Sequence, residues 1–419
     1  MAKRVVIAGA GYGGVACAQH LQKHTRPDEC EITVVNKLPY HSMQTQLHEI
    51  AAWSREPDEI VVPLEYLFDT RRVQIGVDEI DHVDLENRQL VVREGKPIAY
   101  DVLILGVGSV PEYFNIEGLA EYAMTLNSVQ NAVKVRKAIY HALEMARENP
   151  DDPLWSTILI GGAGLTGVEL AGELADNLPD LCERVGISPS KIRIVVVEAM
   201  QTVLPGMDPD LVSHAKQYLE EKGIQIYTGV PIARASTDLL ELGDGTQLRS
   251  KTIIWTGGVR SNPILEASGF ECAARGRAKV NEFLQAEGHE EVFVIGDCAL
   301  TIGENGRPMP PTAQLAEQEG DWVGANVIRL LRHEALQSFH PDIVATVGSV
   351  GRHLGIALFK GGRKHFGGFA HFLKSGVNWQ YWLRIGGLGF LFHQWFHRHW
   401  QQPLPLESTE TEALQEVQA

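Results

Sequence analysis

The sequence predicts an α/β protein in which one parallel-sheet unit occurs twice. Three observations support this prediction: a short apolar run that enters a glycine-rich turn near residue 9, the same pattern near residue 161, and a further pair of apolar runs that end in glycine at a similar spacing. The 419 residues are enough for two or three domains. A composition with 44% hydrophobic and 21% charged residues is typical of a globular protein and argues against a disordered or fibrous chain.

The first unit lies at the start of the chain, where an apolar run from residue 5 leads us to expect no signal peptide. Residues 5–8 predict a strand, a GxGxxG turn follows, and residues 15–21 are compatible with a helix. Such a turn lets the backbone approach a pyrophosphate at the N-terminus of the helix, as in Rossmann-like dinucleotide-binding domains. The residues of the predicted turn are Gly9, Gly11, Tyr12, Gly13 and Gly14.

The second strand of this unit, predicted over 32–35, ends in an unusual pair. Asn36 and Lys37 stand where the fold usually has an acidic residue that binds a ribose hydroxyl. Because an amide can also bond to a hydroxyl, we expect a ribose contact from Asn36, with an added contact from Lys37. A role of Asn36 without a ribose contact is an equal alternative.

The second unit repeats this pattern roughly 150 residues later. Residues 157–161 form the apolar run, residues 192–197 predict the second strand, and Glu198 closes that strand. A carboxylate there suits a free ribose 2′-hydroxyl and repels a 2′-phosphate, which favours NADH over NADPH. The residues expected to hold this nucleotide are Gly162, Gly164, Leu165, Thr166, Gly167, Glu198 and Gly258.

A further pair of segments keeps nearly the same offset. Residues 103–109 and 253–258 are apolar runs that end in glycine, with Gly108 and Gly258 at matching positions. Two pairs of motifs at one spacing indicate two copies of one domain, whereas chance turn glycines would not keep this register.

Charge and cysteine content exclude several classes of function. A net charge of −16 disfavours binding to nucleic acid, which requires a basic face. The five cysteines form no CxxC pattern, so we expect no metal site and no redox-active dithiol, and a reducing intracellular compartment fits best.

These motifs resemble the flavoprotein reductases with two dinucleotide domains, in which an NADH domain is inserted into an FAD domain. The resemblance implies a discontinuous FAD domain over 1–114 and 263–340, an NADH domain over 115–262, and one non-covalent FAD. The run 292–299 is similar to the late FAD signature of that family, in which Asp297 would accept a hydrogen bond from the ribityl chain. Ile80 stands where the family contacts the adenine.

A closer resemblance, over residues 1 to about 400, is to the type II NADH dehydrogenases, which are single-subunit NADH:quinone oxidoreductases. Residues 310–318 are similar to their AQxAxQ motif, so Ala313 and Gln314 would lie at the flavin, and Gln314 and Gln318, four apart on one helical face, at the quinone. Pro311 is a helix-start signal before this run. Glu169 matches a glutamate near the nicotinamide and the flavin, and Lys374 resembles a lysine near the flavin. Two solvated glutamines and a first-turn acid are the structural alternatives.

The C-terminal segment, predicted over 341–400, differs from the rest of the chain. Residues 351–400 contain seven Lys or Arg, no Asp or Glu, and twelve aromatic residues, including Trp379 and Trp382. Rings and cations together are typical of a membrane interface, and no apolar stretch is long enough to span a bilayer. We expect an amphipathic segment with one roughly helical apolar face, interrupted by glycines, on the cytoplasmic face of the membrane; a homodimer interface is the alternative. Residues 401–419 are expected to be a disordered tail.

The function implied by this resemblance is oxidation of NADH by hydride transfer to FAD and reduction of a membrane quinone to quinol, without proton pumping. Glu169, Gln314 and Gln318 would be the catalytic residues. One alternative is a flavoprotein reductase that uses a soluble protein acceptor. Another is a sulfide:quinone oxidoreductase, which would need a cysteine after Cys298 that the sequence lacks. A membrane-bound NADH sensor without turnover is the alternative from a different class.

Overall fold

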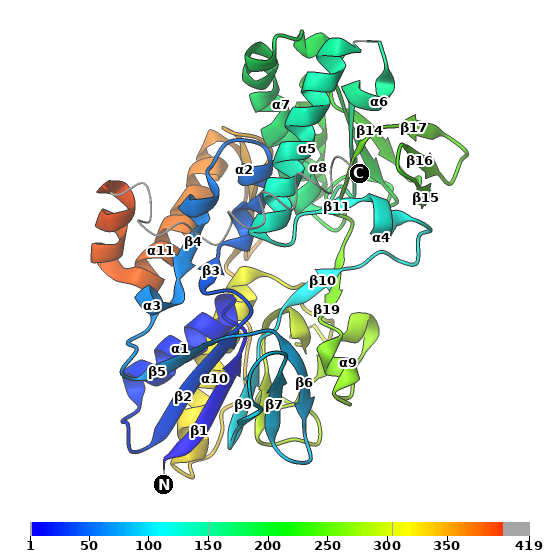
Figure 1. Ribbon diagram of the computed structural model, residues 1–419. Helices are drawn as coiled ribbons and strands as arrows, with labels where there is room; N and C mark the ends of the chain where they lie inside the picture. The colour runs from blue at the N-terminus through cyan, green and yellow to red at the C-terminus, as the bar shows by residue number, and fades with distance from the viewer. Residues whose placement is uncertain (1, 150, 304, 397–419) are drawn as a thin grey trace.

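The computed structural model describes residues 2–149, 151–303 and 305–396, and its two largest sheets are both parallel and five-stranded. In the first unit the strand order is β21 (Val292–Val294), β9 (Val102–Leu105), β1 (Lys3–Ala8), β2 (Cys30–Asn36) and β5 (Val73–Val77). In the second unit it is β11 (Met124–Thr125), β18 (Thr252–Trp255), β12 (Thr157–Gly161), β13 (Arg193–Glu198) and β14 (Gln225–Thr228). Figure 1 shows the two units as separate lobes.

The predicted repeat is confirmed down to the smaller elements. Each unit has a helix after the strand that enters its glycine turn, α1 (Tyr12–His24) after β1 and α7 (Leu165–Val185) after β12. Each unit also has a three-stranded antiparallel sheet before a later core strand. These small sheets are β6 (Ile80–Asp84), β7 (Gln89–Val92) and β8 (Ile98–Ala99) in the first unit, and β15 (Ile232–Ala235), β16 (Leu239–Leu242) and β17 (Gln247–Arg249) in the second. Residues 73–84 form two strands, β5 and β6, because the chain turns there from the parallel sheet into the small antiparallel sheet.

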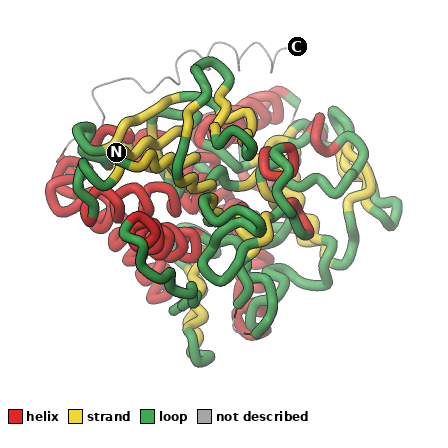
Figure 2. Tube along the Cα trace, turned by 90° about the horizontal axis from the view of Figure 1, so that it is seen from below, coloured by secondary structure: helices red, strands yellow, loops and turns green. Residues whose placement is uncertain are grey.

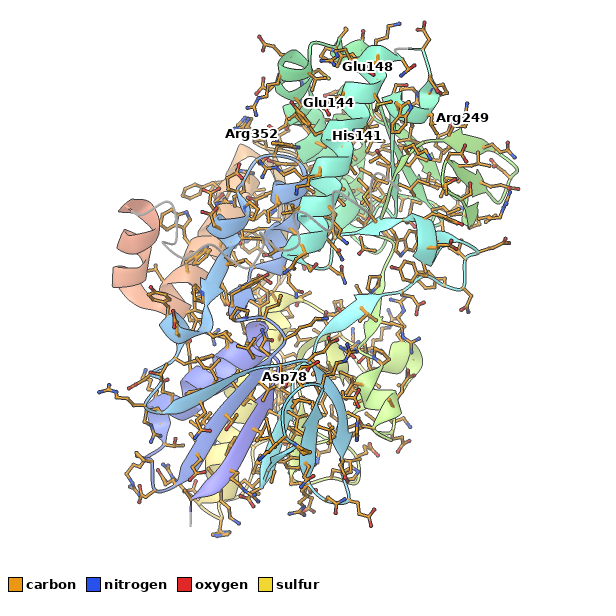
Figure 3. All side chains as sticks on the ribbon, viewed as in Figure 1. Asp78, His141, Glu144, Glu148, Arg249 and Arg352 are labelled. Carbon is orange, nitrogen blue, oxygen red and sulfur yellow. The ribbon has the colours of Figure 1, made fainter. Side chains whose placement is uncertain are left out.

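The chain passes between the two units through one antiparallel pair. β10 (Ser109–Pro111) leaves the first unit and pairs with β19 (Val259–Ser261), which returns to it. Figure 3 shows the result: Asp78, which follows β5, lies in the first unit, whereas Arg249 on β17 lies in the second. The boundaries predicted at 114/115 and 262/263 fall just beyond these two strands.

Helices cover the sheets and carry most of the polar site residues. α10 (Ala313–Leu331) packs along α1 in the first unit, and Figure 2 shows helices against the strand layer near the N-terminus. The two helices approach so closely that a Cβ atom on Gly320 would lie 2.2 Å from the carbonyl oxygen of Gly13, so only glycine fits at this position. The remaining helices are α2 (Leu47–Ala51), α3 (Leu64–Leu67), α4 (Leu119–Tyr122), α5 (Val129–Glu148), α6 (Pro153–Ser156), α8 (Pro209–Glu221) and α9 (Ile264–Ala267).

The C-terminal segment begins with a small sheet that the sequence did not predict. β23 (Ala345–Ser349), β24 (Gly355–Phe359) and β25 (Lys364–Gly367) form an antiparallel sheet that packs between α7 and the last helix, α11 (Gly368–Phe396). A Cβ atom on Gly172 of α7 would lie 2.4 Å from the carbonyl oxygen of Val350. This sheet therefore joins the C-terminal segment directly to the second unit. Two further pairs, β3 (Tyr40–Ser42) with β4 (Val61–Pro63) and β20 (Ala278–Lys279) with β22 (Ala299–Leu300), complete the described strands.

The apolar residues of α11 divide between two environments. Trp379 is 54% exposed, whereas Ile385 is 5% exposed and lies in the core of the first unit. The helix is interrupted at Gly387, whose φ of 67° is outside the helical range. The apolar residues of α11 therefore do not form the single exposed face that the sequence predicted, because Ile385 packs on the protein whereas Trp379 faces solvent. None of the helices in the described ranges is long and apolar enough to cross a bilayer, and the predicted tail over 401–419 lies outside those ranges.

Candidate functional site

The two glycine turns have the same backbone geometry. Gly9 and Gly162 have φ angles of 101° and 100°. A Cβ atom on Gly14 would lie 1.9 Å from the carbonyl oxygen of Gly9, and one on Gly167 would lie 1.9 Å from that of Gly162. The first glycine of each turn needs a left-handed backbone, and the last needs space for the helix to approach the strand.

The middle glycine of each turn faces open space instead. A Cβ atom on Gly11 or Gly164 would have no protein atom within 4 Å, and neither residue has a left-handed φ angle. The fold does not require glycine here, whereas a pyrophosphate that approaches the N-terminus of α1 or α7 does. Both turns therefore fit a dinucleotide. Tyr12 and Gly13, and likewise Leu165 and Thr166, form the first turn of the corresponding helix.

Asn36 and Glu198 occupy equivalent places and bind the turn that precedes them. Asn36 Oδ1 accepts from the backbone N–H of Ala10 at 2.9 Å, and Glu198 Oε2 accepts from that of Ala163 at 2.7 Å. Asn36 Nδ2 also donates to the carbonyl oxygen of Leu38 at 2.7 Å. In this structure both ends of the Asn36 amide bond to the backbone.

Three other predicted ligand-binding residues, Lys37, Ile80 and Gly258, lie close to the dinucleotide turns or follow the strands of the two sheets. Lys37 forms an ion pair with Glu79, with Nζ 3.1 Å from Oε1. Ile80, at the start of β6, is 9% exposed. Gly258, with a φ of 149°, lies after β18 at the equivalent position to Gly108 after β9.

Asp297 lies in the short turn over 296–298 that follows β21, the edge strand of the first sheet. Its Oδ2 accepts from Ser109 Oγ at 2.6 Å, and burial raises the pKa of this carboxyl group although the Ser109 bond opposes the change. Gly296, with a φ of 70°, donates its backbone N–H to the buried Glu319 of α10. The loop that carries Asp297 is therefore tied to β10 on one side and to α10 on the other.

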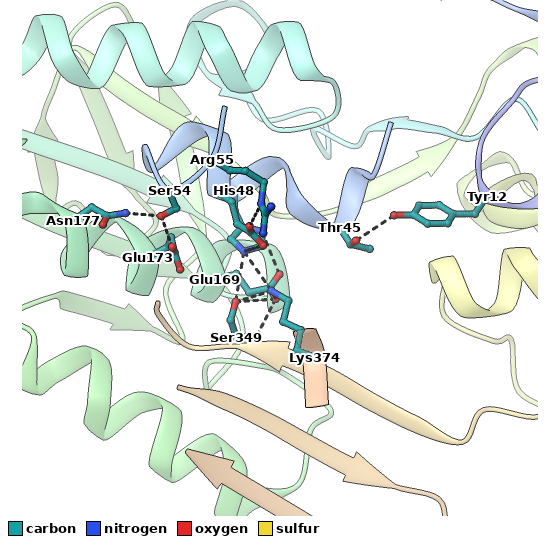
Figure 4. Close-up of polar contacts among 11 residues, drawn as sticks. Tyr12, Thr45, His48, Ser54, Arg55, Glu169, Glu173, Asn177, Ser349 and Lys374 are labelled. Carbon is teal, nitrogen blue, oxygen red and sulfur yellow. Dashed lines mark hydrogen bonds and ion pairs between the residues drawn. The ribbon is translucent and has the colours of Figure 1, made fainter. Parts of the chain in front are cut away.

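The structure brings Glu169 and Lys374 together, a contact that the sequence did not predict. Lys374 Nζ donates to Glu169 Oε1 and to Ser349 Oγ, each at 2.7 Å (Figure 4). His48 Nδ1 lies 3.8 Å from the second oxygen of Glu169. All four residues are buried, so α2, α7, β23 and α11 each contribute one side chain to this cluster.

Electrostatics in this cluster favour an ionised Glu169. Burial alone would raise the pKa of the Glu169 carboxyl group, but the charges of Lys374 and His48, together with hydrogen bonds from Lys374 and Ser349, outweigh burial, and the pKa lies below its usual value. Burial and the same ammonium group lower the pKa of His48, which favours the neutral imidazole. The cluster therefore holds one buried ion pair beside a neutral ring, a combination that fixes side-chain positions.

A cavity of about 480 Å³ lies beside the ion pair and is lined by residues from α2, α7 and α11. Glu173, one helical turn after Glu169, lines it and accepts a hydrogen bond from Ser54 (Figure 4). Gln46 Oε1 and His371 Nδ1 belong to the lining residues and have no hydrogen-bond partner among the described residues. The cavity therefore has room for a polar ligand or ordered water.

The predicted glutamine motif begins α10. Thr312 caps the helix by accepting from the backbone N–H of Leu315, so the helix starts two residues after Pro311, at Ala313. Gln314 follows Ala313 in the first turn. Gln318 bonds twice to the backbone of Asp342, donating to its carbonyl oxygen at 2.7 Å and accepting from its N–H at 2.9 Å.

Sequence reasoning missed His48, Ser349 and most of the residues that line the cavity. His48 lies in the short helix α2 and Ser349 ends a short strand, and neither belongs to a motif with a fixed spacing. Their importance arises from tertiary contacts over more than 150 residues of sequence. No signal in the sequence alone identifies them.

Comparison with known proteins identifies the family to which the chain belongs. The family model described as pyridine nucleotide-disulphide oxidoreductase matches residues 3–320. A type II NADH:quinone oxidoreductase of Staphylococcus epidermidis is 36% identical over 397 residues, covering 93% of this chain and 98% of the relative. That of Staphylococcus aureus is 35% identical over 398 residues, with the same coverage.

Solved structures show the same fold at low sequence identity. NDH2 of Plasmodium falciparum in complex with NADH superposes with a TM-score of 0.81 at 17% identity, covering 95% of this chain and 99% of that one. The sulfide:quinone oxidoreductase of Aquifex aeolicus gives 0.76 at 19% identity, covering 93% and 92%. The fold, the two dinucleotide turns and the full-length relatives agree, and the chain belongs to the pyridine nucleotide-disulphide oxidoreductase family and, within it, to the type II NADH:quinone oxidoreductases.

Proposed function

We propose that this protein oxidises NADH and reduces a quinone to a quinol, with one non-covalently bound FAD and without proton pumping. The observation that carries the proposal is the ion pair between Glu169 and Lys374, which joins the expected nicotinamide site to the expected flavin site. Bound FAD supplies the redox chemistry between the two substrates. The protein supplies binding, orientation and electrostatics.

The first unit is the proposed FAD site, within an FAD domain over 1–114 and 263–340. The open space at Gly11 and the loop around Asp297 support this assignment. The proposed FAD contacts are Gly9, Gly11, Tyr12, Gly13, Gly14, Asn36, Lys37, Ile80, Gly108, Asp297, Ala313, Gln314 and Lys374.

The second unit is the proposed NADH site, within a domain over 115–262. Residues 199–206 contain no Lys or Arg that could bind a 2′-phosphate, and Glu198 supplies a carboxylate at the same place. The proposed NADH contacts are Gly162, Gly164, Leu165, Thr166, Gly167, Glu169, Glu198 and Gly258.

Glu169 and Lys374 have distinct proposed roles. Lys374 carries a buried positive charge, which stabilises negative charge that develops nearby during electron transfer. Glu169 holds the Lys374 ammonium group in place and orients the nicotinamide from the first turns of α7. His48 and Ser349 restrict the side chains of both residues.

The quinone is proposed to bind beside the start of α10, next to Gln314 and Gln318. Gln318 is tied to Asp342 through one of its two amide N–H groups, so the second N–H can still donate to a quinone oxygen. Gln314 lies one turn closer to the N-terminus of α10, which is the end that favours negative charge.

Residues 351–400 are the proposed region of attachment to the cytoplasmic face of the membrane. The exposed side of α11 carries large apolar residues at helical spacing and no acidic residue. Such a face enters the headgroup region of a bilayer, while basic residues favour anionic lipid. A homodimer through the same surface is the competing arrangement. The large apolar residues exposed on α11 are Phe369, Phe372, Val377, Trp379 and Leu383.

Sulfide oxidation is disfavoured by the cysteines. Cys298 is fully buried and donates to the carbonyl oxygen of Gly108, and burial raises the pKa of its thiol to about 12. A buried thiol with this pKa does not supply the thiolate that attacks sulfur.

The proposal is tested by the stoichiometry of turnover. Purified protein that contains FAD is expected to consume one NADH for each short-chain quinone reduced, and to use NADPH poorly. Turnover with NADH and a soluble electron-transfer protein, but with none of several quinones, would contradict the proposed acceptor.

A further inference from the structure

One acidic residue of the glutamine motif is bound to the C-terminal helix. Glu317 lies between Gln314 and Gln318, and its Oε2 is 2.6 Å from Nη1 of Arg384 on α11. The other guanidinium nitrogen of Arg384 lies 2.5 Å from Asp321 Oδ2, one turn further along α10. One arginine therefore bridges two carboxylates of α10.

The surroundings of Glu317 include ionisable groups from three elements. Tyr12 at the start of α1 and Tyr381 on α11 both interact with its charge, and their rings are 4.8 Å apart. The hydroxyl group of Tyr381 also hydrogen-bonds to His41 Nε2 at 2.8 Å, and His20 Nδ1 of α1 lies 3.9 Å from Asp321 Oδ1.

Glu317 is poised to exchange a proton near neutral pH. Burial raises the pKa of its carboxyl group to about 7, with Asp321 acting in the same direction and Arg384 in the opposite one. Its side chain is still 18% exposed, so protons can reach it from solvent.

Reduction of a quinone by NADH requires one proton from outside the hydride. NADH gives a hydride, which contains two electrons and one hydrogen, whereas the quinol gains two electrons and two hydrogens. The overall change is NADH + H⁺ + quinone → NAD⁺ + quinol. A group beside the quinone must supply the second hydrogen as a proton.

We infer that Glu317 delivers this proton to a quinone bound beside the first turns of α10. The inference rests on the proposed function and adds a proton donor to it. The O–H bond of the Glu317 carboxyl group breaks as an O–H bond forms on a quinone oxygen, and the resulting carboxylate is held by Arg384 until a solvent proton restores the acid. The electrons come from NADH, so the carboxyl group is neither oxidised nor reduced.

The main test is the pH profile of quinone reduction in Glu317→Gln. Wild-type activity is expected to fall as the pH rises through about 7, because the carboxyl group must be protonated to act. The variant is expected to lose about 100-fold in kcat with quinone at pH 6, the usual contribution of a general acid, and to lack this fall. Glu334→Gln, the same change at an exposed position after α10, is the control and keeps the wild-type profile.

Two neighbouring variants shift the profile in opposite directions. Asp321→Asn removes a repelling carboxylate, lowers the pKa of Glu317 and moves the fall in activity to lower pH. Arg384→Met removes the stabilising cation and moves the fall to higher pH. A folding defect in Glu317→Gln leaves this pair of shifts to decide the question.

The outcomes separate the inference from the proposed function. Flavin content and anaerobic bleaching by NADH report whether the variants fold and take up hydride. A wild-type profile that is flat around pH 7, a fall retained in Glu317→Gln, or equal profiles in Asp321→Asn and Arg384→Met would each overturn the role of Glu317. Absence of quinone reduction in the wild type would instead overturn the proposed function itself.

Discussion

The ammonium group of Lys374 lies 2.7 Å from the carboxylate of Glu169, across 205 residues of sequence. Each side chain is about 10% exposed, so the pair is shielded from water by the protein around it. Glu169 comes from the second unit, and Lys374 comes from the helix that follows both units. Their contact fixes the C-terminal helix against the helix that starts at the second glycine turn.

Breaking this pair from one side should destabilise the protein strongly. Lys374→Met leaves a buried carboxylate without its cation, for which a loss of about 3–5 kcal/mol in the free energy of unfolding is expected. Glu169→Gln combined with Lys374→Met should recover much of that loss. Urea unfolding measures both, with Lys360→Met at the exposed pair with Asp342 as a control that changes stability by less than about 1 kcal/mol. Additive losses in the double variant would contradict the coupling.

The two kinds of glycine in the first turn should respond differently to alanine. Gly11→Ala places a methyl group in open space, so the apoprotein should lose less than about 1 kcal/mol of stability while FAD retention falls. Gly14→Ala forces a carbon atom to 1.9 Å from the carbonyl oxygen of Gly9 and should impair folding itself. Flavin content and thermal unfolding distinguish the two. Full FAD retention in Gly11→Ala would show that no phosphate approaches this residue.

Gly164→Ala applies the same reasoning to the second turn. This variant should keep its FAD and its stability but require at least about tenfold more NADH, because the added methyl group also faces open space. Steady-state kinetics with varied NADH measure the change. Loss of FAD instead of NADH affinity would mean that the ligands of the two units have been exchanged.

Glu198 should set the preference for NADH over NADPH. Glu198→Gln removes the negative charge at the end of β13, and the preference for NADH is expected to narrow about tenfold, or about 1.4 kcal/mol. The ratio of kcat/KM for the two nucleotides is the measurement. Glu221→Gln, at the exposed end of α8, is the matched control. An unchanged ratio in Glu198→Gln would remove the residue from nucleotide selection.

Gln318 should act on the quinone and not on NADH. Gln318→Ala is expected to raise the quinone concentration needed for half-maximal rate, while the rate of flavin reduction by NADH stays unchanged. Gln318→Ala also removes the two bonds that hold the backbone of Asp342 against α10. Asp342→Ala keeps both of these bonds and is the control for changes that arise from the side chain of Asp342 alone. Slower flavin reduction in Gln318→Ala would contradict the assignment.

Glu319 should make stability depend on pH. Burial raises the pKa of this carboxyl group to about 7 from an ordinary 4.5. The folded state therefore binds the Glu319 proton more tightly than the unfolded state does. This protonated carboxyl group contributes its full stabilisation below pH 4.5, and the contribution is lost as the pH rises to about 7. Urea unfolding across this range should show a smaller loss in Glu319→Gln than in the wild type. The same slope in both would assign the pH dependence to other groups.

The local parts of this structure were predictable and the long-range parts were not. The turns at Gly9 and Gly162 are encoded within a few residues, because sterics at each glycine decide the backbone. Glu169 and Lys374 were singled out separately by resemblance, but their contact depends on how α11 and β23 pack against α7. The sheet of β23–β25 was missed because its strands are short and rich in glycine, and the division of α11 between Trp379 and Ile385 follows from packing alone.

The central claim, that NADH and a quinone exchange electrons through one FAD in this chain, is tested most directly by anaerobic rapid mixing. The protein with bound FAD is mixed with NADH, flavin absorbance is followed, and a short-chain quinone is then added to the same sample. We predict bleaching by NADH and return of the absorbance on addition of quinone. Bleaching that quinone does not reverse would contradict the proposed acceptor, and absence of bleaching would contradict NADH as the donor.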